Sequence, residues 1–333
     1  MAKRRLSQQQ KARIQQGQAQ RLRNAQKTQS WDDDSTLGPE QHGMVTARYS
    51  RHVDIAPQHE DGSLGENRRC HVRANVTSIT VGDEIVWRET AQGDAVVVAV
   101  AQRRSLIERP DSYGKMKAVA ANIDQIFIVF AAEPEPHPNL IDRYLIAAEN
   151  AGITACLVFN KVDLATAGAF AELLDTYRAL KYPVFPVSAE THSGLEALRQ
   201  ALAGKTSVFV GQSGVGKSSI INALLPELGL KTGTLSDHVT KGRHTTTTSG
   251  LYALPEGGYL IDSPGIREFH LSHFEPAEIY AGYRELQPLL GQCQFRDCQH
   301  DQEPGCAIKD YLNSGKMAAT RMQSLHYIIN GPD

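Results

Sequence analysis

A glycine-rich segment contains the residue types that binding of a nucleoside triphosphate requires. The run Gly211-Gln-Ser-Gly-Val-Gly-Lys-Ser218 fits the G-x-x-x-x-G-K-[ST] pattern of a phosphate-binding loop. Its glycines let backbone N–H groups point at phosphate oxygens, and the Lys217 ammonium adds a positive charge. The Ser218 hydroxyl is a candidate Mg²⁺ ligand. The segment predicts nucleotide contacts from Gly211, Gln212, Ser213, Gly214, Val215, Gly216, Lys217, Ser218 and Ser219.

Two shorter segments are candidates for reading the base. Asn160-Lys-Val-Asp163 and Val187-Ser-Ala189 each end an expected strand. The Asp163 carboxylate can accept hydrogen bonds from the N1–H and 2-amino groups of guanine, two donors that adenine lacks. With a phosphate-binding loop in the same chain, the pattern favours GTP over ATP. We expect nucleotide contacts from Asn160, Lys161, Val162, Asp163, Ser188 and Ala189.

The segment Asp262-Ser-Pro-Gly265 begins at the end of an expected strand, 45 residues after Lys217. A carboxylate at Asp262 suits a site near Mg²⁺, and the Gly265 N–H can reach a γ-phosphate. On its own, this sequence is also typical of an ordinary turn. Beside a phosphate-binding loop, we interpret both residues as nucleotide contacts.

The polar run Lys241–Thr248 predicts a mobile loop, in which one hydroxyl, assigned to Thr246, binds Mg²⁺ when a γ-phosphate is present. Many GTPases place a water-orienting Gln directly after the glycine of the Asp-x-x-Gly segment, but here that residue is Ile266. We therefore predict slow hydrolysis without a partner, with His244 as the candidate that orients the attacking water. An exposed loop histidine that contacts RNA is an equal alternative for His244, and the threonines also suit the start of a strand.

Three cysteines and a histidine lie within 14 residues near the C-terminus. Three thiolates and one imidazole supply the four ligands of a closed tetrahedral zinc site, which predicts a structural zinc ion. Disulfides are the alternative, but an odd number of cysteines in an expected cytoplasmic protein argues against them. The expected zinc ligands are Cys293, Cys298, His300 and Cys306.

The elements that must position these residues follow two different patterns. From about residue 44 to 108, short alternating segments such as His71–Val76 and Asp83–Arg88 predict strands of a small β-barrel, with an OB-fold as the leading interpretation. We expect Ala95–Val100 to be a strand buried on both faces. After Pro110, apolar strands alternate with helices of 10–15 residues, which predicts a parallel α/β sheet.

The N-terminal stretch differs from the rest of the chain. It holds eight basic and no acidic residues between Met1 and Trp31, so we expect a disordered arm that binds nucleic acid or simply solubilises the chain. The predicted organisation is therefore multi-domain: a disordered basic arm (1–38), an OB-fold RNA-binding domain (39–109), a nucleotide-binding domain (110–272) and a helical zinc-binding domain (273–333).

Composition places the chain among globular proteins. It has 333 residues, 41% of them hydrophobic, and a net charge of −2. Its longest apolar runs are seven residues, whereas a membrane-spanning helix needs about 20. With five cysteines and no apolar leader, we expect a cytoplasmic protein without membrane contact. Nothing indicates an oligomer, so a monomer is expected.

The order of the motifs is unusual for a GTPase. In ordinary GTPases the phosphate-binding loop precedes Asn-Lys-x-Asp, whereas here it follows. The nucleotide-binding domain is therefore interpreted as a circularly permuted α/β P-loop GTPase domain, which is possible because the joined termini lie at the surface. One consequence is that Asp262–Gly265 leads directly into the cysteine-containing module.

Together, the barrel, the permuted motifs and the Cys-Cys-His-Cys set resemble the RsgA (YjeQ) family of small-ribosomal-subunit biogenesis GTPases over about residues 40–310. The resemblance implies a GTP hydrolase that uses GTP/GDP, Mg²⁺ and one structural Zn²⁺. It also implies binding to the small ribosomal subunit and its 16S rRNA, weak activity that the subunit stimulates, and dissociation after hydrolysis. The basic arm is not among the shared motifs.

Two other classes stay open from the residues alone. One is a P-loop kinase or ATPase that carries a zinc module, and nucleotide preference would separate it from a GTPase. The other is a zinc-ribbon nucleic-acid binder without catalysis, which requires an inactive nucleotide-binding domain although every motif looks intact.

Overall fold

The computed structural model describes residues 37–49, 52–76, 78–111, 113–228, 250–262, 274–301 and 303–331. The chain divides into two compact units. The first comprises the described parts of Met1–Ile79 and Asp83–Gln102, and the second comprises Thr80–Gly82 and the described parts of Arg103–Asp333. Within these ranges, no helix has both the length and the apolar character needed to cross a membrane.

The first unit is a closed five-stranded barrel. Its strands pair in the order β1-β2-β3-β5-β4, and an additional pairing between β1 and β4 closes the barrel. The β3–β5 pair is parallel, while the other pairs are antiparallel. This confirms the predicted OB-fold barrel. The strands are β1 (Gln41–Arg48), β2 (Val53–Pro57), β3 (Arg68–Val72), β4 (Glu84–Glu89) and β5 (Ala95–Val100).

Alternation along the strands fills the barrel with apolar side chains, among them the fully buried Ile55 and Trp87. Two strand predictions need correction. Strand β3 starts at Arg68 and ends at Val72, so it lies earlier than the expected His71–Val76, because it pairs with residues Val53–Ile55 of β2. Only the first half of β5 is buried on both faces, since Ala99 is exposed.

The second unit contains a twisted sheet in the order β10-β9-β8-β11-β13-β12. All neighbours are parallel except β12, which pairs antiparallel with β13 at one edge. The central strand β8 is buried at every position because helices cover both faces of the sheet. The strands are β8 (Gln125–Ala131), β9 (Thr154–Asn160), β10 (Val184–Pro186), β11 (Lys205–Val210), β12 (Gly250–Ala253) and β13 (Gly258–Asp262).

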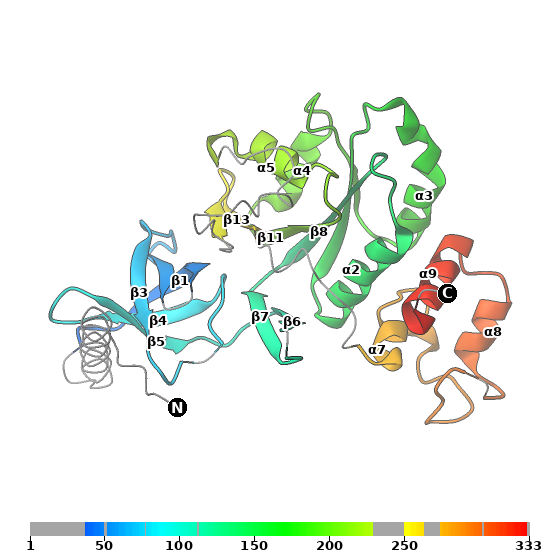
Figure 1. The fold of residues 1–333 in the computed structure, drawn as a ribbon, viewed down its shortest axis with the longest axis horizontal. Coiled ribbons are helices and arrows are strands. Elements are labelled where there is room, and N and C mark those ends of the chain that lie inside the picture. The colour runs from blue at the N-terminus through cyan, green and yellow to red at the C-terminus, as the bar shows by residue number, and fades with distance from the viewer. Residues whose placement is uncertain are drawn as a thin grey trace, which may run out of the picture. The chain divides into compact units, whose positions relative to one another are not determined.

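Helices α2 and α3 lie on one side of this sheet, and α4 and α5 lie on the other (Figure 1). Phe127 and Val129 of β8 pack in the same core as α4 and α5. The predicted parallel α/β architecture is therefore confirmed. The helices are α2 (Pro138–Asn150), α3 (Ala171–Ala179), α4 (Leu195–Leu202) and α5 (Lys217–Leu224), with 3₁₀ segments at Ala165–Phe170 and Pro226–Leu228.

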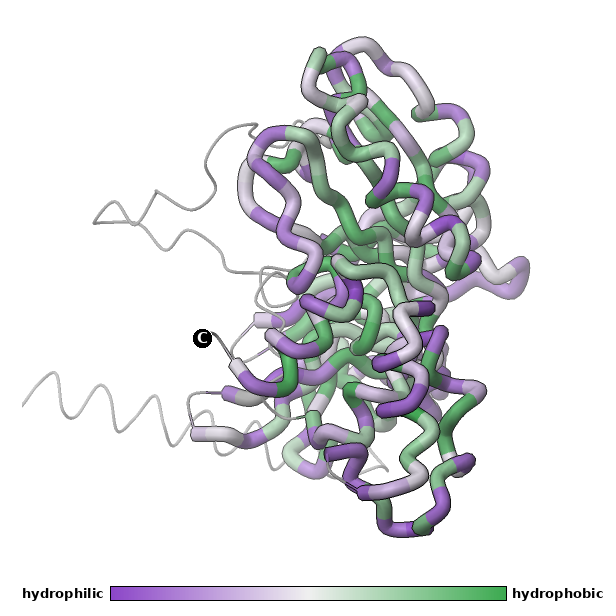
Figure 2. The backbone as a smooth tube through the Cα atoms, turned by 90° about the vertical axis from the view of Figure 1, so that its right-hand side faces the viewer, coloured by the Kyte–Doolittle hydropathy of each residue, from purple (hydrophilic) through white to green (hydrophobic). Residues whose placement is uncertain are grey.

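Sequence analysis did not identify an antiparallel hairpin that precedes the sheet, formed by β6 (Leu106–Pro110) and β7 (Met116–Ala121). After the sheet, a helical module forms its own apolar core, which packs against α2 through Ile146. Figure 2 shows apolar stretches along the interior strands and hydrophilic stretches in the outer loops. The module contains α7 (Pro276–Ala281), a 3₁₀ segment (Gln287–Leu289), α8 (Ala307–Asn313) and α9 (Ala319–Asn330).

A buried ion network joins this module to the sheet domain. Arg321 of α9 is 2% exposed and donates hydrogen bonds to Asp142 of α2 and, at 2.9 Å, to both carboxylate oxygens of Glu285. The Tyr177 hydroxyl donates to the same Asp142 carboxylate at 2.9 Å. Burial raises the pKa of Asp142, and the Arg321 charge opposes that shift.

Candidate nucleotide and zinc sites

The motifs predicted to bind nucleotide converge at one edge of the parallel sheet. Asn160 ends β9, Ser188 follows β10, Gly211 follows β11 and Asp262 ends β13. Because parallel strands share a direction, all four positions lie at the carboxyl edge. Ligands of open α/β sheets bind at this edge.

The phosphate loop has a backbone that only glycine permits at two positions. Gly211 has a φ of +133°, and a Cβ there would lie 2.0 Å from the Val129 carbonyl oxygen. Gly216 has a φ of +93°, and a Cβ there would lie 2.2 Å from the Asn160 amide nitrogen. These close approaches account for two glycines of the motif, because any side chain would push the loop away from its neighbours.

Helix α5 begins at Lys217, so its N-terminus lies at the loop, where a helix dipole favours an anion. The Lys217 ammonium donates to the carbonyls of Gly211, at 2.7 Å, and Gln212, at 2.5 Å. This position keeps the ammonium folded over the loop that a phosphate would enter. Ser218 and Ser219 lie half-buried in the first turn of α5.

Asn160 connects the base-reading segment to the phosphate loop. Its Nδ2 donates to the Val215 carbonyl at 2.9 Å, and its Oδ1 accepts a hydrogen bond from the Ala189 N–H at 3.2 Å. The side chain is 2% exposed, so both bonds lie away from water. Asn160 thus braces three loops, while the Ala189 N–H, expected to meet guanine O6, donates to Asn160 in this structure.

Lys161 has a contact that sequence analysis missed. Its ammonium donates to the carbonyls of Glu133, at 2.6 Å, and Gly214, at 3.0 Å. The Glu133 carboxylate accepts a hydrogen bond from the Thr166 hydroxyl at 3.2 Å. Glu133 follows β8 at the same carboxyl edge, and that position was the signal that could have identified it.

Asp163 and Ser188 occupy different environments. The Asp163 carboxylate is exposed and makes no hydrogen bond or ion pair within the described ranges, so it is free to accept donors from a base. Ser188 is fully buried, and its hydroxyl accepts a hydrogen bond from the Thr191 N–H at 3.1 Å. The Val162 N–H donates to the Val187 carbonyl at 3.2 Å, which keeps the two base-reading segments adjacent.

Asp262 is half-buried at the end of β13 and pairs across the sheet edge with Gly250 of β12. Three residues predicted for the γ-phosphate end of the site, His244, Thr246 and Gly265, lie outside the described residues. The structure therefore brings the base-reading residues, the phosphate-loop residues and Asp262 to the same edge of the sheet.

The four predicted zinc ligands form one cluster. Their ligand atoms all lie within 4.8 Å of one another. The His300 Nδ1 lies 3.5 Å from the Cys293 Sγ and 3.4 Å from the Cys306 Sγ, and the two sulfurs are 3.9 Å apart. Tetrahedral zinc with bonds of about 2.3 Å needs sulfurs about 3.8 Å apart. The donor set and spacing therefore fit a zinc ion held by Cys293, Cys298, His300 and Cys306.

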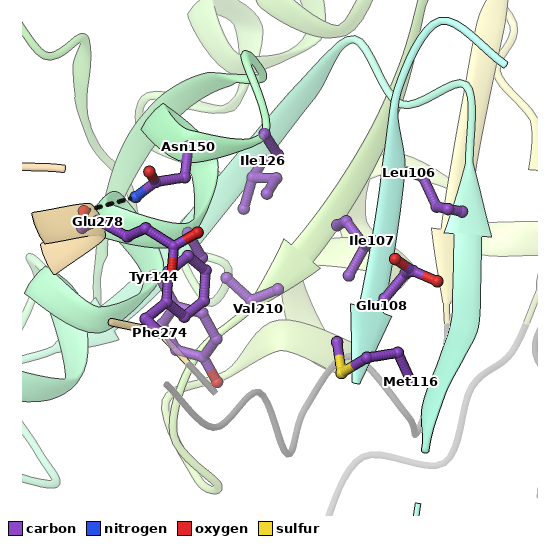
Figure 3. A pocket seen from close by; sticks show the side chains of 12 residues that line it. Leu106, Ile107, Glu108, Met116, Ile126, Tyr144, Asn150, Val210, Phe274 and Glu278 are labelled. Atoms are coloured by element: carbon purple, nitrogen blue, oxygen red, sulfur yellow. Dashed lines mark hydrogen bonds between the residues drawn. The ribbon is translucent and has the colours of Figure 1, made fainter. Parts of the chain in front are cut away.

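A separate cavity of about 240 Å³ lies between the β6–β7 hairpin and α2 (Figure 3). Of the predicted nucleotide-binding residues that the structure describes, none lines it. Tyr144 of α2 lines this cavity, and its hydroxyl is hydrogen-bonded to the backbone of Gly211. Burial raises the pKa of Tyr144 to about 12, while the Gly211 contact opposes that shift. Tyr144, like Glu133, was missed by sequence analysis, and it contacts the phosphate loop.

Comparisons with known proteins agree with this arrangement. The sequence pattern of the RsgA GTPase family matches residues 100–272. The Chromohalobacter salexigens protein named small ribosomal subunit biogenesis GTPase RsgA is 51% identical, with 99% of each chain covered. The protein of the same name from Azotobacter vinelandii is 50% identical, with 99% of this chain and 98% of that protein covered.

Two solved structures share the fold. The crystal structure of YjeQ from Thermotoga maritima has a TM-score of 0.71 and 32% identity, covering 89% of this chain and 100% of that chain. The structure of YloQ, described as a circularly permuted GTPase, has a TM-score of 0.67 and 25% identity, covering 89% of this chain and 97% of that chain. The chain therefore belongs to the RsgA family of small ribosomal subunit biogenesis GTPases.

Proposed function

We propose that this chain binds the small ribosomal subunit and its 16S rRNA in its GTP state, late in maturation of the subunit. The subunit stimulates GTP hydrolysis, and hydrolysis releases the protein. The nucleotide part of the proposal is carried by the Asn160 side chain, which bonds both Val215 of the phosphate loop and Ala189 of the base-reading segment. A guanine nucleotide bound across these loops is held at its base by the base-reading segments and at its phosphates by the phosphate loop. The ribosomal part of the proposal is supported by the names of the similar proteins.

The nucleotide contacts proposed are those of the base-reading segments, the phosphate loop, Asp262 and Gly265. Asp163 accepts from the guanine base, and Lys217 moves from carbonyl oxygens to phosphates when the nucleotide enters. Ser218 holds Mg²⁺, joined by Thr246 when a γ-phosphate is present. His244 orients the attacking water when the small subunit is bound, and so supplies the water-orienting group that Ile266 lacks.

The Cys3His cluster is proposed to hold one zinc ion in a structural role, because all four positions of a tetrahedral ion are filled by protein. We propose that the protein acts as a monomer in the cytoplasm. The barrel and the N-terminal basic residues are proposed to contact RNA.

Phosphate release from GTP and from ATP, measured with purified small subunits, with large subunits and with neither, tests the proposal. We expect slow release from GTP alone, strong acceleration by the small subunit only, and no release from ATP. A rate that the small subunit does not change would contradict the ribosomal part of the proposal. Equal turnover of ATP would contradict the assignment of the base site.

A further inference from the structure

A polar cavity of about 260 Å³ lies where the start of α2 meets the end of α9. It is separate from the nucleotide site, and its walls come from both the sheet domain and the zinc-containing module. Among the described residues, no carboxylate lines it; the described lining residues are His137, Asn139, Leu140, Arg143 and Tyr327.

Arg143 has an unsatisfied donor at this cavity. Its guanidinium lies over the ring of Tyr327, with the central carbon 5.8 Å from the ring centroid. Its Nε is buried and has no hydrogen-bond partner among the described residues. Arg284, by contrast, pairs with the Glu149 carboxylate at 2.6 Å. Buried donors are nearly always paired, and Arg143 also has no carboxylate partner among the described residues, so its charge is available to an anion.

The start of α2 adds further unused donors. His137 immediately precedes this 13-residue helix, and its exposed side chain makes no capping bond. Neither His137 nor Asn139 has a side-chain hydrogen bond within the described ranges. The N-terminus of a helix also favours negative charge. A guanidinium, an imidazole and an amide therefore converge with a helix N-terminus, and an anion fits all four.

We propose that this cavity binds a phosphate group of the rRNA backbone when the chain is on the small subunit. Arg143 makes the charged contact, and His137 and Asn139 donate from the helix start. The ring of Tyr327, 37% exposed, offers a surface for the adjoining sugar or base. RNA contacts commonly combine arginine, polar donors and aromatic rings in this way. The inference rests on the proposed function, because it locates part of the surface that the subunit would contact.

The cavity also lies close to the phosphate loop. His137 and Leu140 line a second, smaller cavity together with Gly211 and Gln212. RNA bound at the start of α2 would therefore contact His137, which lies beside the phosphate loop. This gives the subunit a short physical route to the site of hydrolysis.

The test uses the full chain with a non-hydrolysable GTP analogue and purified small subunits. Binding is measured over a series of salt concentrations for wild type, Arg143→Gln, Arg143→Lys and His137→Gln. The matched control is Lys205→Gln, which removes one exposed charge at the start of β11, the opposite end of that strand from the phosphate loop.

We expect Arg143→Gln to weaken binding about threefold to tenfold and to reduce the slope of log affinity against log salt by about 0.7–0.9, the value for one lost phosphate contact. Arg143→Lys keeps most of the slope, because it keeps the charge. His137→Gln, at an exposed position whose side chain makes no capping bond, weakens binding without the large change in slope. Lys205→Gln matches wild type, and basal GTP hydrolysis stays unchanged in every variant.

Wild-type binding with an unchanged slope for Arg143→Gln would overturn this inference alone. Absence of wild-type binding would overturn the proposed function and the inference together. In a separate arm, inorganic phosphate is titrated against the Arg143 Nε–H nuclear magnetic resonance signal. A shift there, combined with an unchanged salt slope on the subunit, would assign the cavity to a free anion and overturn the RNA assignment.

Discussion

The Nδ2 of Asn160 donates a hydrogen bond to the Val215 carbonyl at 2.9 Å, although the two residues are 55 positions apart in the chain. Asn160 belongs to the base-reading segment, which precedes the phosphate loop in this sequence. The bond depends on where the strands end in the sheet and not on the order in which the chain visits them. A circular permutation can therefore leave the junction between the two loops unchanged.

Replacement of Asn160 by alanine removes two buried hydrogen bonds and leaves the Val215 carbonyl without its donor. We expect Asn160→Ala to lose about 1–3 kcal/mol of unfolding free energy and to bind GDP at least about tenfold more weakly. Chemical denaturation and calorimetric titration with GDP measure the two effects. Asn139→Ala, at the start of α2, is the control and should match wild type when ribosomal subunits are absent. Unchanged GDP affinity would show that the bridge does not support the site.

Asp163→Asn tests the choice of base. An amide at this position presents a donor to the N1–H of guanine, so we expect GDP affinity to fall about tenfold to a hundredfold, equivalent to about 1.5–3 kcal/mol. The same variant should gain affinity for xanthosine diphosphate, whose base carries a carbonyl where guanine carries the amino group. Calorimetric titration with both nucleotides provides the check. A variant that keeps GDP affinity and ignores the xanthine nucleotide would contradict the role of Asp163.

Arg321→Met leaves Asp142 buried without its counter-charge. Breaking a buried pair in this way costs about 3–5 kcal/mol. Arg178→Met is the matched control, because Arg178 pairs with Asp175 on the exposed surface of α3, where a pair contributes about 0–1 kcal/mol. Denaturation of both variants against wild type measures the difference. Similar losses for the two would mean that the buried network does not hold the helical module to α2.

The same variant should show a defined dependence on pH. Burial raises the pKa of Asp142, and loss of the Arg321 charge raises it further, while the unfolded carboxyl keeps a pKa of about 3.9. A raised folded-state pKa gives stability that is fully present below the unfolded pKa and is lost as pH rises through the folded pKa. The deficit of Arg321→Met relative to wild type should therefore be smaller at acidic pH than at neutral pH, as thermal melts at both would reveal. A constant deficit would contradict this account.

Removal of zinc should affect the helical module first. We expect one zinc ion per chain in wild type and much less in Cys298→Ser, measured by elemental analysis. A strong chelator should accelerate hydrogen exchange in α7 and α8 while the parallel sheet stays protected, because Cys306 caps the N-terminus of α8 and packs in the core of the module. Cys156→Ala changes a buried cysteine of β9 far along the chain from the cluster, and should retain zinc. Full zinc content in Cys298→Ser would exclude that residue as a ligand.

His244→Ala separates catalysis from binding. If His244 orients the attacking water, the variant should lose subunit-stimulated turnover by about a hundredfold to ten-thousandfold, the range for a positioned acid–base group. GTP affinity should stay near that of wild type, because the phosphate loop and the base-reading segments are unaltered. Single-turnover hydrolysis with small subunits is the measurement. Full stimulated turnover would leave His244 as a residue that contacts RNA or solvent.

Most of the fold was predictable because the relevant signals are local. The alternation of strands with helices after Pro110 predicted the parallel sheet. The glycines Gly211 and Gly216 indicated a loop whose positive φ angles disfavour other residues. The Cys3His spacing brought all four donors within 4.8 Å of one another, as the motif indicated. These features need only neighbours in the sequence, together with the rule that parallel strands share an edge.

Contacts between distant parts of the chain were not predictable in the same way. Arg321 and Asp142 are 179 residues apart, and nothing near either residue indicates the other. Glu133 binds Lys161 through its backbone carbonyl, an acceptor that every residue possesses, so its side-chain type gives no signal. The hairpin that ends in the exposed Tyr113 alternates too weakly to be separated from the barrel by periodicity alone.

The position of β11 between β8 and β13 has a consequence for synthesis of the protein on the ribosome. Translation completes β8, β9 and β10 before Lys205–Val210 exists, so the growing sheet ends at β8, whose seven residues are all buried in the finished protein. An unpaired apolar edge is a template for pairing with other chains. A nascent chain that stalls before residue 205 would therefore lack the partner that covers this edge of β8 in the finished protein.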